Sequence, residues 1–362
     1  MKEPILLTPG PTPLPPSVRE ALGRPIIHHR TKEFGKLFGS VISDLSYVFR
    51  TRETVLVMAC SGTGGMESSV ANLCSPGDST IVVSTGAFGD RFVSIHKAYG
   101  LSPIVVKEEW GRAADPDKLK TALRTNSGVK AVFLQHTDTS TGVVNDLRNL
   151  AQCVRENSDA LVVVDSISGL AAEPLETDQW GLDVVLAASQ KGLMNAPGLA
   201  FAAVSAKAWK AVENAGLPRF YFDWRTMKKS LADSETPYTP AVALLAGQAE
   251  ALRLIRAEGI EKVWERTAAL AAHARAQGAK LGLSQFPKDP SVILTSLKLP
   301  EGLDGQKLVE EILAEEGISI AGGQAQLKGK IIRVAHMGHI SKADLDAGFA
   351  AVARKLSACA AR

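Results

Sequence analysis

The chain has 362 residues, of which 45% are hydrophobic and 22% charged, and its formal net charge is +3. That length can hold two domains, and the small net charge provides no basic surface for nucleic acid or an acidic membrane. No apolar run reaches the roughly 20 residues that span a bilayer. The four cysteines are scattered without a C-x-x-C pair, which indicates free thiols and argues against structural zinc. We therefore expect a cytoplasmic protein with no metal site and no nucleic-acid or membrane partner.

The first segment cannot be regular structure, because residues 5–16 contain five prolines. We expect an extended arm that lies over the rest of the chain. After the arm, Ser17 is predicted to cap a helix, and residues 33–50 have the apolar spacing of a second helix.

From Thr54 onward, predicted strands alternate with predicted helices. This alternation is typical of a mainly parallel sheet that is covered by helices on both faces. Right-handed crossovers then place the strand carboxyl ends along one edge, where ligands bind. The predicted strands are 55–59, 79–84, 103–107, 129–135, 161–164, 184–188 and 200–204, and the predicted helices are 64–73, 92–99, 115–123 and 147–157.

The second half of the chain is predicted to end in a smaller unit. Residues 219–240 read as irregular, and long helices are expected at 241–258 and 259–281. Shorter elements follow, with strands at 292–297 and 331–334 and helices at 305–315 and 342–356. The fold class is therefore α/β, with an N-terminal arm over 1–14, a large domain over 15–258 and a small α+β domain over 259–362.

Lys191 directly follows the predicted buried strand Val184–Ala188 and the pair Ser189–Gln190. Burial against apolar groups lowers the pKa of a lysine, because it disfavours the charged form. An unprotonated lysine is a nucleophile that forms an imine with a carbonyl compound. Taken alone, this stretch also fits an ordinary solvated lysine at the end of a strand.

The glycine-rich segment 61–67, S-G-T-G-G-M-E, follows a predicted strand and opens a helix. Such a turn leaves backbone N–H groups free at a helix N-terminus, which favours an anion. The segment is not a P-loop, since it lacks G-K-S/T, and it does not fit the dinucleotide pattern G-x-G-x-x-G. A single phosphate on a small cofactor suits it better than a nucleotide does.

Two further segments follow neighbouring strands. Phe88 lies between small residues in 86–91, where its ring could stack on a planar ligand or simply join the core. Residues 136–142, H-T-D-T-S-T-G, are polar and rich in hydroxyl groups. They lie at a strand's carboxyl end, where ligands bind in such sheets, although a solvated loop has the same composition.

Asp165 ends the apolar run of residues 161–164. A buried carboxylate is costly unless a positive partner meets it, and a protonated pyridine nitrogen would be such a partner. One crossover separates Asp165 from Lys191, so both side chains can reach one pocket. Each signal is weak by itself, but together they place polar chemistry at successive strand ends of one sheet.

This combination resembles the class V, fold-type I family of pyridoxal-phosphate aminotransferases, and within it the alanine–glyoxylate and serine–pyruvate or serine–glyoxylate branch. The motifs S-G-T-G-x-M-E, G-x-F-G-D-R, T-S-T-G, V-D-S and S-Q-K-G occur in this order. The resemblance extends from T-P-G-P-T-P at 8–13 to I-I-R-V at 331–334, which is nearly the whole chain.

The resemblance implies that pyridoxal 5'-phosphate is the cofactor. Lys191 would form the imine with the cofactor aldehyde and then transfer a proton, while Asp165 would pair with the pyridinium nitrogen. Phe88 would stack on the ring; relatives often carry Trp there. The remaining implied contacts are Thr63, Gly64, Gly65 and Gln190 at the phosphate, Thr139 at the hydroxyl edge of the ring, and Ile167 on its other face.

The resemblance also implies a homodimer with shared active sites. Thr239 matches a residue that reaches the phosphate of the neighbouring subunit, although Thr236 is a near alternative in the same segment. Arg333 matches the arginine that binds the substrate α-carboxylate, and a guanidinium fork suits that task.

The implied activity is ping-pong transamination between alanine or serine and glyoxylate or pyruvate. Other pairs with aspartate, a phosphonate amine or ureidoglycine stay open, as does a non-catalytic role in a larger complex. Gln190 stands where cysteine desulfurases carry a histidine, and no cysteine occupies a comparable C-terminal loop, which argues against desulfuration.

Overall fold

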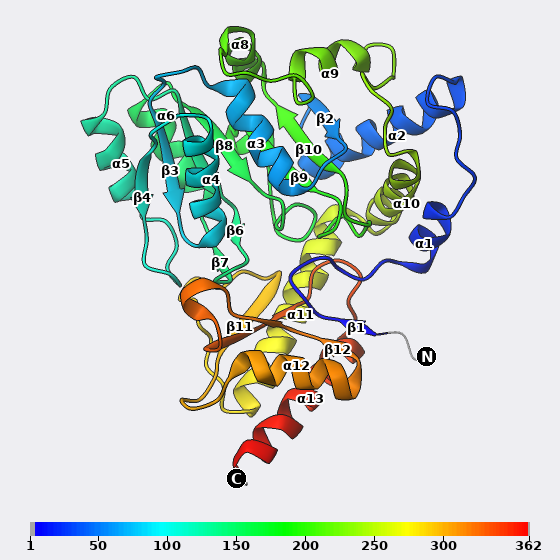
Figure 1. Ribbon diagram of the computed structural model, residues 1–362, viewed down its shortest axis with the longest axis vertical. Coiled ribbons are helices and arrows are strands. Elements are labelled where there is room, and N and C mark those ends of the chain that lie inside the picture. The colour runs from blue at the N-terminus through cyan, green and yellow to red at the C-terminus, as the bar shows by residue number, and fades with distance from the viewer. Residues whose placement is uncertain (1–3, 361–362) are drawn as a thin grey trace.

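The computed structural model describes residues 4–360, with side chains to residue 358. Figure 1 shows a larger upper part built around a sheet and a smaller lower part that contains the C-terminal elements. The N-terminal arm runs between the two parts. The domain boundaries at 14/15 and 258/259 stay predictions.

The upper part contains a seven-stranded sheet in which β10 alone runs antiparallel to its neighbours. The alternating βα connections predict this arrangement, since parallel neighbours need a crossover between them. The strand order is β2 (Thr54–Met58), β10 (Ala200–Val204), β9 (Val184–Ala188), β8 (Leu161–Asp165), β5 (Ala131–Gln135), β3 (Thr80–Ser84) and β4 (Ile104–Lys107).

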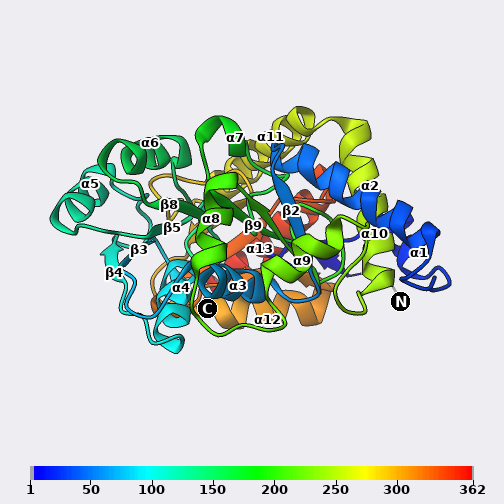
Figure 2. The ribbon, with the colours of Figure 1, turned by 90° about the horizontal axis from the view of Figure 1, so that it is seen from above.

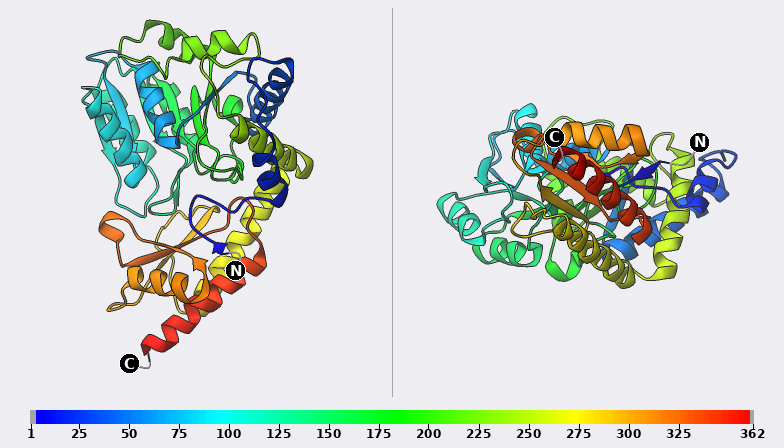
Figure 3. Two further views of the ribbon diagram at one scale, coloured as in Figure 1. Left: turned by 45° about the vertical axis from the view of Figure 1, so that its right-hand side comes forward. Right: turned by 90° about the horizontal axis from the view of Figure 1, so that it is seen from below.

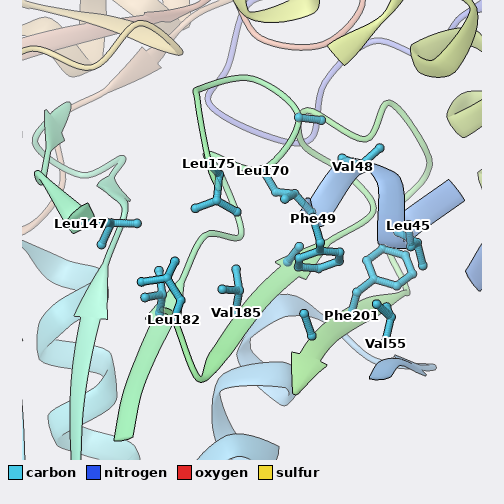
Figure 4. Close-up of a cluster of buried hydrophobic side chains, with 14 of the residues drawn as sticks. Leu45, Val48, Phe49, Val55, Leu147, Leu170, Leu175, Leu182, Val185 and Phe201 are labelled. Carbon is cyan, nitrogen blue, oxygen red and sulfur yellow. The ribbon is translucent and has the colours of Figure 1, made fainter. Parts of the chain in front are cut away.

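Helices cover both faces of this sheet (Figure 2). Alternate residues of a strand enter opposite apolar cores, as Val162 and Val163 of β8 do. In Figure 4, Phe49 lies near Val185 of β9. One face carries α2 (Lys32–Phe49), α5 (Pro116–Thr125), α6 (Leu147–Asn157) and α10 (Val242–Glu258), and the other α3 (Gly62–Leu73), α4 (Ala87–Ala98), α8 (Ala206–Asn214) and α9 (Trp224–Leu231).

The lower part has its own apolar core and a three-stranded antiparallel sheet, and its last helix projects outward in Figure 3. Arm strand β1 (Ile5–Leu6) pairs with β12 (Ile318–Ser319). The other elements of this part are α11 (Ile260–Lys280), β11 (Leu294–Lys298), α12 (Gly305–Glu316), β13 (Ala321–Gly322), η1 (Ala325–Leu327), β14 (Ile331–Ala335) and α13 (Lys342–Ala360).

Short elements complete the chain. They are α1 (Pro16–Leu22), α7 (Thr177–Trp180) and the hairpin of β6 (Thr137–Asp138) and β7 (Val143–Val144). Within residues 4–360, no helix combines the length and the apolar character needed to cross a membrane.

The predicted alternation of strands and helices is confirmed, but three local predictions were wrong. Ser17 does not cap α1, because Pro15 is the N-cap and Pro16 begins the helix, where a missing N–H costs nothing. Residues 219–240 contain α9, which Asp223 caps. The arm is not wholly irregular, since β1 pairs as a short strand.

Helix α4 begins at Ala87, five residues earlier than its predicted start at Phe92. The carboxylate of Asp138 accepts hydrogen bonds from the backbone N–H groups of Phe88 and Gly89, at 2.9 and 3.3 Å. This cap comes from a loop far along the chain, so local sequence patterns could not predict it.

Replacing Phe133 by Ala should lower the free energy of unfolding by about 3–5 kcal/mol, because the ring is fully buried and its loss leaves a cavity. The ring packs against Phe92 and His96, with centroids 5.1 and 4.5 Å apart. Urea unfolding measures the change. Val105→Ala on the edge strand, where the side chain is 41% exposed, serves as control and should change stability little. Equal losses for both variants would contradict this packing.

Candidate active site

Lys191 lies just beyond the carboxyl end of β9, and its side chain is almost fully buried. Its ammonium group donates a hydrogen bond to the carbonyl oxygen of Pro9 in the arm. Burial lowers its pKa to about 8, with Asp165 opposing the shift and Arg333 adding to it. Near neutral pH about a tenth of this amine is therefore in the unprotonated form that acts as a nucleophile, a far larger share than for an exposed lysine.

Asp165 is the last residue of β8 and is also buried. Its Oδ1 accepts a hydrogen bond from the backbone N–H of Ile167 at 2.9 Å. Burial raises its pKa to about 7, against the lowering effects of that hydrogen bond and of Lys191. For both Asp165 and Lys191, the cost of burying charge outweighs their mutual attraction. A further cation beside Asp165 would shift it toward the ionised form.

The turn from β2 into α3 presents a potential anion site. Within residues 4–360, the backbone N–H groups of Gly62, Thr63 and Gly64 form no backbone hydrogen bonds, whereas that of Gly65 donates to Ser61. Free donors at the start of a helix attract phosphate. A Cβ on Gly62 would lie 2.8 Å from Ile167 Cδ1, so the turn packs closely against the loop after β8.

Phe88 occupies the first turn of α4 and is half-buried. The guanidinium carbon of Arg91 lies 4.6 Å from its ring centroid, and Arg91 also donates to Thr63 Oγ1 at 3.0 Å. The start of α4 is thereby connected to the start of α3. The cap from Asp138 fixes the Phe88 backbone from the opposite side.

Arg333 lies on β14, and its side chain is only 5% exposed. Its Nε donates to the carbonyl of Gly322 at 2.8 Å, and its Nη1 donates to the carbonyl of Thr139 at 2.6 Å. These bonds fix the orientation of the guanidinium yet use only two of its five N–H groups. Burial lowers its pKa to about 10, so the group stays charged at neutral pH.

The structure brings together most of the residues that the sequence singles out. Lys191, Asp165 and Arg333 interact electrostatically, and Thr139 contacts Arg333 through its carbonyl. Gln190 precedes Lys191 in the chain, and its Oε1 is a buried acceptor without a hydrogen-bond partner.

Thr239 is not part of this cluster. It is exposed in the segment before α10, and none of its described contacts reaches Lys191 or Asp165. Thr236 is buried, and its hydroxyl donates to the carbonyl of Tyr238 at 2.8 Å.

The sequence analysis did not assign Pro9, Gly10, Arg91 or Asp138. The carbonyl of Pro9 and the Cα of Gly10 lie against the Lys191 amine. Pro9 and Gly10 belong to the proline-rich motif, and Arg91 belongs to G-x-F-G-D-R. The motifs therefore identified these segments as part of the site but did not predict which residues these three contact. No cluster of three metal-ligating side chains occurs within the described residues.

The family model described as aminotransferase class V matches residues 9–345 of the chain. Among curated relatives, the soluble hydrogenase 42 kDa subunit of Anabaena cylindrica is 39% identical, over 94% of this chain and 90% of its own length. The serine–glyoxylate aminotransferase of Methylorubrum extorquens is 35% identical, over 94% and 88%. The L-aspartate–glyoxylate aminotransferase of Paracoccus denitrificans is 32% identical, over 96% and 90%.

Among solved structures, an alanine–glyoxylate aminotransferase from Nostoc sp. superposes with a TM-score of 0.94. The two chains are 29% identical, and the match covers 98% of this chain and 96% of the other. The described fold therefore extends over nearly the full length of that structure.

The lowered pKa of Lys191 predicts how its reactivity depends on pH. In the cofactor-free chain, the rate at which an amine reagent labels Lys191 should rise through a midpoint near pH 8 and then level off, because the unprotonated amine reacts. Exposed lysines, with an ordinary pKa of about 10.4, should keep rising well beyond that pH. Quantitative peptide mass spectrometry measures both rates, and a midpoint for Lys191 like that of exposed lysines would refute the burial argument.

Gly10→Ala should slow the labelling of Lys191 strongly, because the new methyl group would overlap the lysine Cε and Nζ. The backbone at Gly10 also has a φ of +110°, which disfavours any side chain. Gly77→Ala is the matched control, since Gly77 has a φ of +85° but open space around it. Equal labelling in the two variants would show that Gly10 does not border the amine.

Proposed function

The chain belongs to the class V aminotransferase family and is an aminotransferase, and we propose that it moves an amino group between a small L-amino acid and a small 2-oxo acid. The donor is alanine or serine and the acceptor glyoxylate or pyruvate, exchanged in a ping-pong reaction. The observation that carries this proposal is the buried Lys191 amine, which interacts electrostatically with Asp165 and Arg333.

The described residues fit pyridoxal 5'-phosphate. The unbonded N–H groups at the start of α3 suit its phosphate. Thr63, Gly64 and Gln190 would hold that end of the cofactor, and Gly65, whose own N–H donates to Ser61, would border it. Phe88 and Ile167 would lie against the two faces of the ring, with Thr139 at its edge. When bound, the cofactor supplies an aldehyde for amines and a ring that withdraws electrons from the substrate α-carbon.

Asp165 would hold the ring nitrogen in its protonated form. Only Oδ1 is used by the Ile167 N–H, so Oδ2 can accept from a cationic N–H. That contact would lower the raised pKa of Asp165 and keep the pair charged. The buried position makes the interaction strong, because little water screens it.

Lys191 would act twice through the same nitrogen. Its unprotonated Nζ would attach to the aldehyde carbon of the cofactor, and once freed it would carry a proton between the substrate α-carbon and that same cofactor carbon. A pKa near 8 suits both roles, since the group can accept and donate at neutral pH.

Arg333 would bind the substrate carboxylate. Its bonds to Gly322 and Thr139 leave N–H groups on Nη1 and Nη2 for a bidentate contact. The preset orientation then fixes which face of the amino acid meets Lys191.

We propose small substrates because the sequence motifs contain no second arginine that could bind a side-chain carboxylate. Arg91, whose charge also acts on Lys191, is already engaged with Phe88 and Thr63. Aspartate is the second candidate donor, favoured by the likeness to the Paracoccus denitrificans enzyme. A non-catalytic role alongside a hydrogenase is suggested by the names of two relatives, the hydrogenase subunits of Anabaena cylindrica and Synechococcus sp.. Against that role, Lys191 and Asp165 are both in place and buried.

We also propose a cytoplasmic homodimer in which Thr239 reaches the neighbouring phosphate site. Thr239 is exposed, and close to it lie the unusually exposed aromatic side chains of Phe220 and Tyr221, at 79% and 43%. Such a patch is typical of an interface. Thr236 is disfavoured for this role because its hydroxyl is buried and already bonded. The three free cysteines that the structure describes fit a reducing compartment.

The amino donor can be identified by half-reactions. The holoenzyme should convert its cofactor to the pyridoxamine form with alanine or serine, and absorbance spectra follow the change. Arg333→Ala should lower kcat/KM by about a hundredfold or more, because two charge-assisted hydrogen bonds are lost, while cofactor affinity stays unchanged. Arg333→Lys keeps the charge and should recover only part of the rate. Conversion by aspartate alone would overturn the substrate assignment.

Shared active sites can be tested by mixing variants. A Lys191→Ala dimer and a Thr239→Ala dimer should each be impaired, but heterodimers contain one site with both native residues. Exchanging subunits should therefore restore up to about half the native activity per heterodimer, since one of two sites is complete. The matched control is the Thr236→Ala dimer, which should be active without any exchange of subunits. No recovery after verified subunit exchange would contradict the shared site.

A further inference from the structure

Residues Leu7–Thr12, here called the strap, connect the strand that carries Arg333 to the turn that carries Lys191. Figure 1 shows the dark-blue arm passing between the lower and upper parts at this point. The strap has one anchor in each part. It therefore spans the gap between the two groups to which we assign substrate binding and catalysis.

The first anchor is Leu7. Its N–H donates to the carbonyl of Ser319, and its carbonyl accepts from the N–H of Ala335, both at 2.8 Å. Ala335 belongs to β14, two positions beyond Arg333. The side chain of Leu7 is fully buried in the core of the lower part, where a Cβ on Gly348 would collide with it.

The second anchor is Thr12. Its hydroxyl donates to the carbonyl of Lys191 at 2.9 Å, and its N–H donates to the carbonyl of Gln190 at 3.0 Å. The residue is 3% exposed. It thus holds two successive peptide groups of the turn that positions the lysine amine.

Between the anchors, the strap is short and turned. The N–H of Gly10 donates to the carbonyl of Thr8 at 2.7 Å, and the Thr8 hydroxyl donates to the carbonyl of Pro11 at 3.1 Å. The carbonyl of Pro9 accepts from the Lys191 amine. Because this path is compact, the distance between the two anchors can change little.

Beyond the strap, packing holds the arm, since Leu14 packs against the core of the upper part and Pro15 is buried. A cavity of about 920 Å³ borders Pro13, Leu14 and Pro15. Within the strap, the hydrogen bonds of Thr12 and Pro9 are what join it to Gln190 and Lys191.

We propose that the strap sets the separation between Arg333 and Lys191, with Thr12 as the positioning residue. In every α-amino acid the carboxylate is bonded directly to the α-carbon whose proton Lys191 would take, so the guanidinium and the lysine must keep a matching separation. Displacement by about 1 Å can cost roughly a hundredfold in rate. This inference rests on the proposed function, since it assigns Arg333 to the substrate carboxylate.

The test compares Thr12→Val with Thr12→Ser in the holoenzyme. Valine has nearly the shape of threonine but cannot donate to the Lys191 carbonyl, whereas serine can. We expect Thr12→Val to lower kcat/KM for the amino donor by about ten- to a hundredfold, through misplacement of the lysine, with cofactor affinity unchanged. Thr12→Ser should stay within a few-fold of the native enzyme. Thr12→Ala replaces the valine variant if that variant does not fold.

A second readout separates positioning from general stability and needs neither cofactor nor turnover. Hydrogen exchange of the cofactor-free chain should be faster in Thr12→Val for peptides covering residues 8–12 and 189–194, and unchanged in the α6 peptide. The labelling midpoint of Lys191 should also move to higher pH, because a loosened lysine gains access to water. A merely structural role would lower Tm while leaving the labelling midpoint and the kinetics as in Thr12→Ser.

The outcomes distinguish the two proposals. If the native enzyme transaminates and Thr12→Val matches it in kinetics, exchange and labelling, the strap proposal is wrong and the proposed function stands. If the native enzyme converts no amino acid, the proposed function fails. The exchange and labelling data then still decide whether Thr12 positions the lysine.

Discussion

The site depends on the burial of opposite charges at the ends of neighbouring strands. Lys191 follows β9 and Asp165 ends β8, and those strands pair in parallel, so their carboxyl ends meet at one edge of the sheet. Desolvation lowers the pKa of the lysine and raises that of the aspartate, although their attraction opposes both shifts. The sheet therefore produces a reactive amine and a carboxylate that a cationic ring would ionise.

Other elements act on this pair from three directions. The start of α3 contributes unbonded N–H groups, and Asp138 fixes the start of α4 with Phe88. From the lower part, Arg333 approaches through its bond to the Thr139 carbonyl. Residues 137–142 thus contact both Phe88, the proposed ring-stacking residue, and Arg333, the proposed carboxylate-binding residue. This short segment therefore connects the two residues.

Much of this arrangement could be predicted from the sequence, because the strand–helix alternation determines where strand ends meet. Lys191, Asp165 and the glycine-rich turn at 61–67 were predicted from local patterns of that kind. Asp138, Pro9 and Gly10 were not, since their contacts join segments far apart in the chain. The early start of α4 was missed for the same reason, and the role proposed for Thr239 requires a proposed second subunit.

The central claim is that one amine, Lys191, captures the cofactor aldehyde. The most direct measurement mixes the purified chain with pyridoxal 5'-phosphate, reduces the adduct with borohydride and maps the added mass by peptide mass spectrometry. The account predicts stoichiometric modification of Lys191 and none in Lys191→Ala. Modification spread over exposed lysines, or retained by Lys191→Ala, would contradict it.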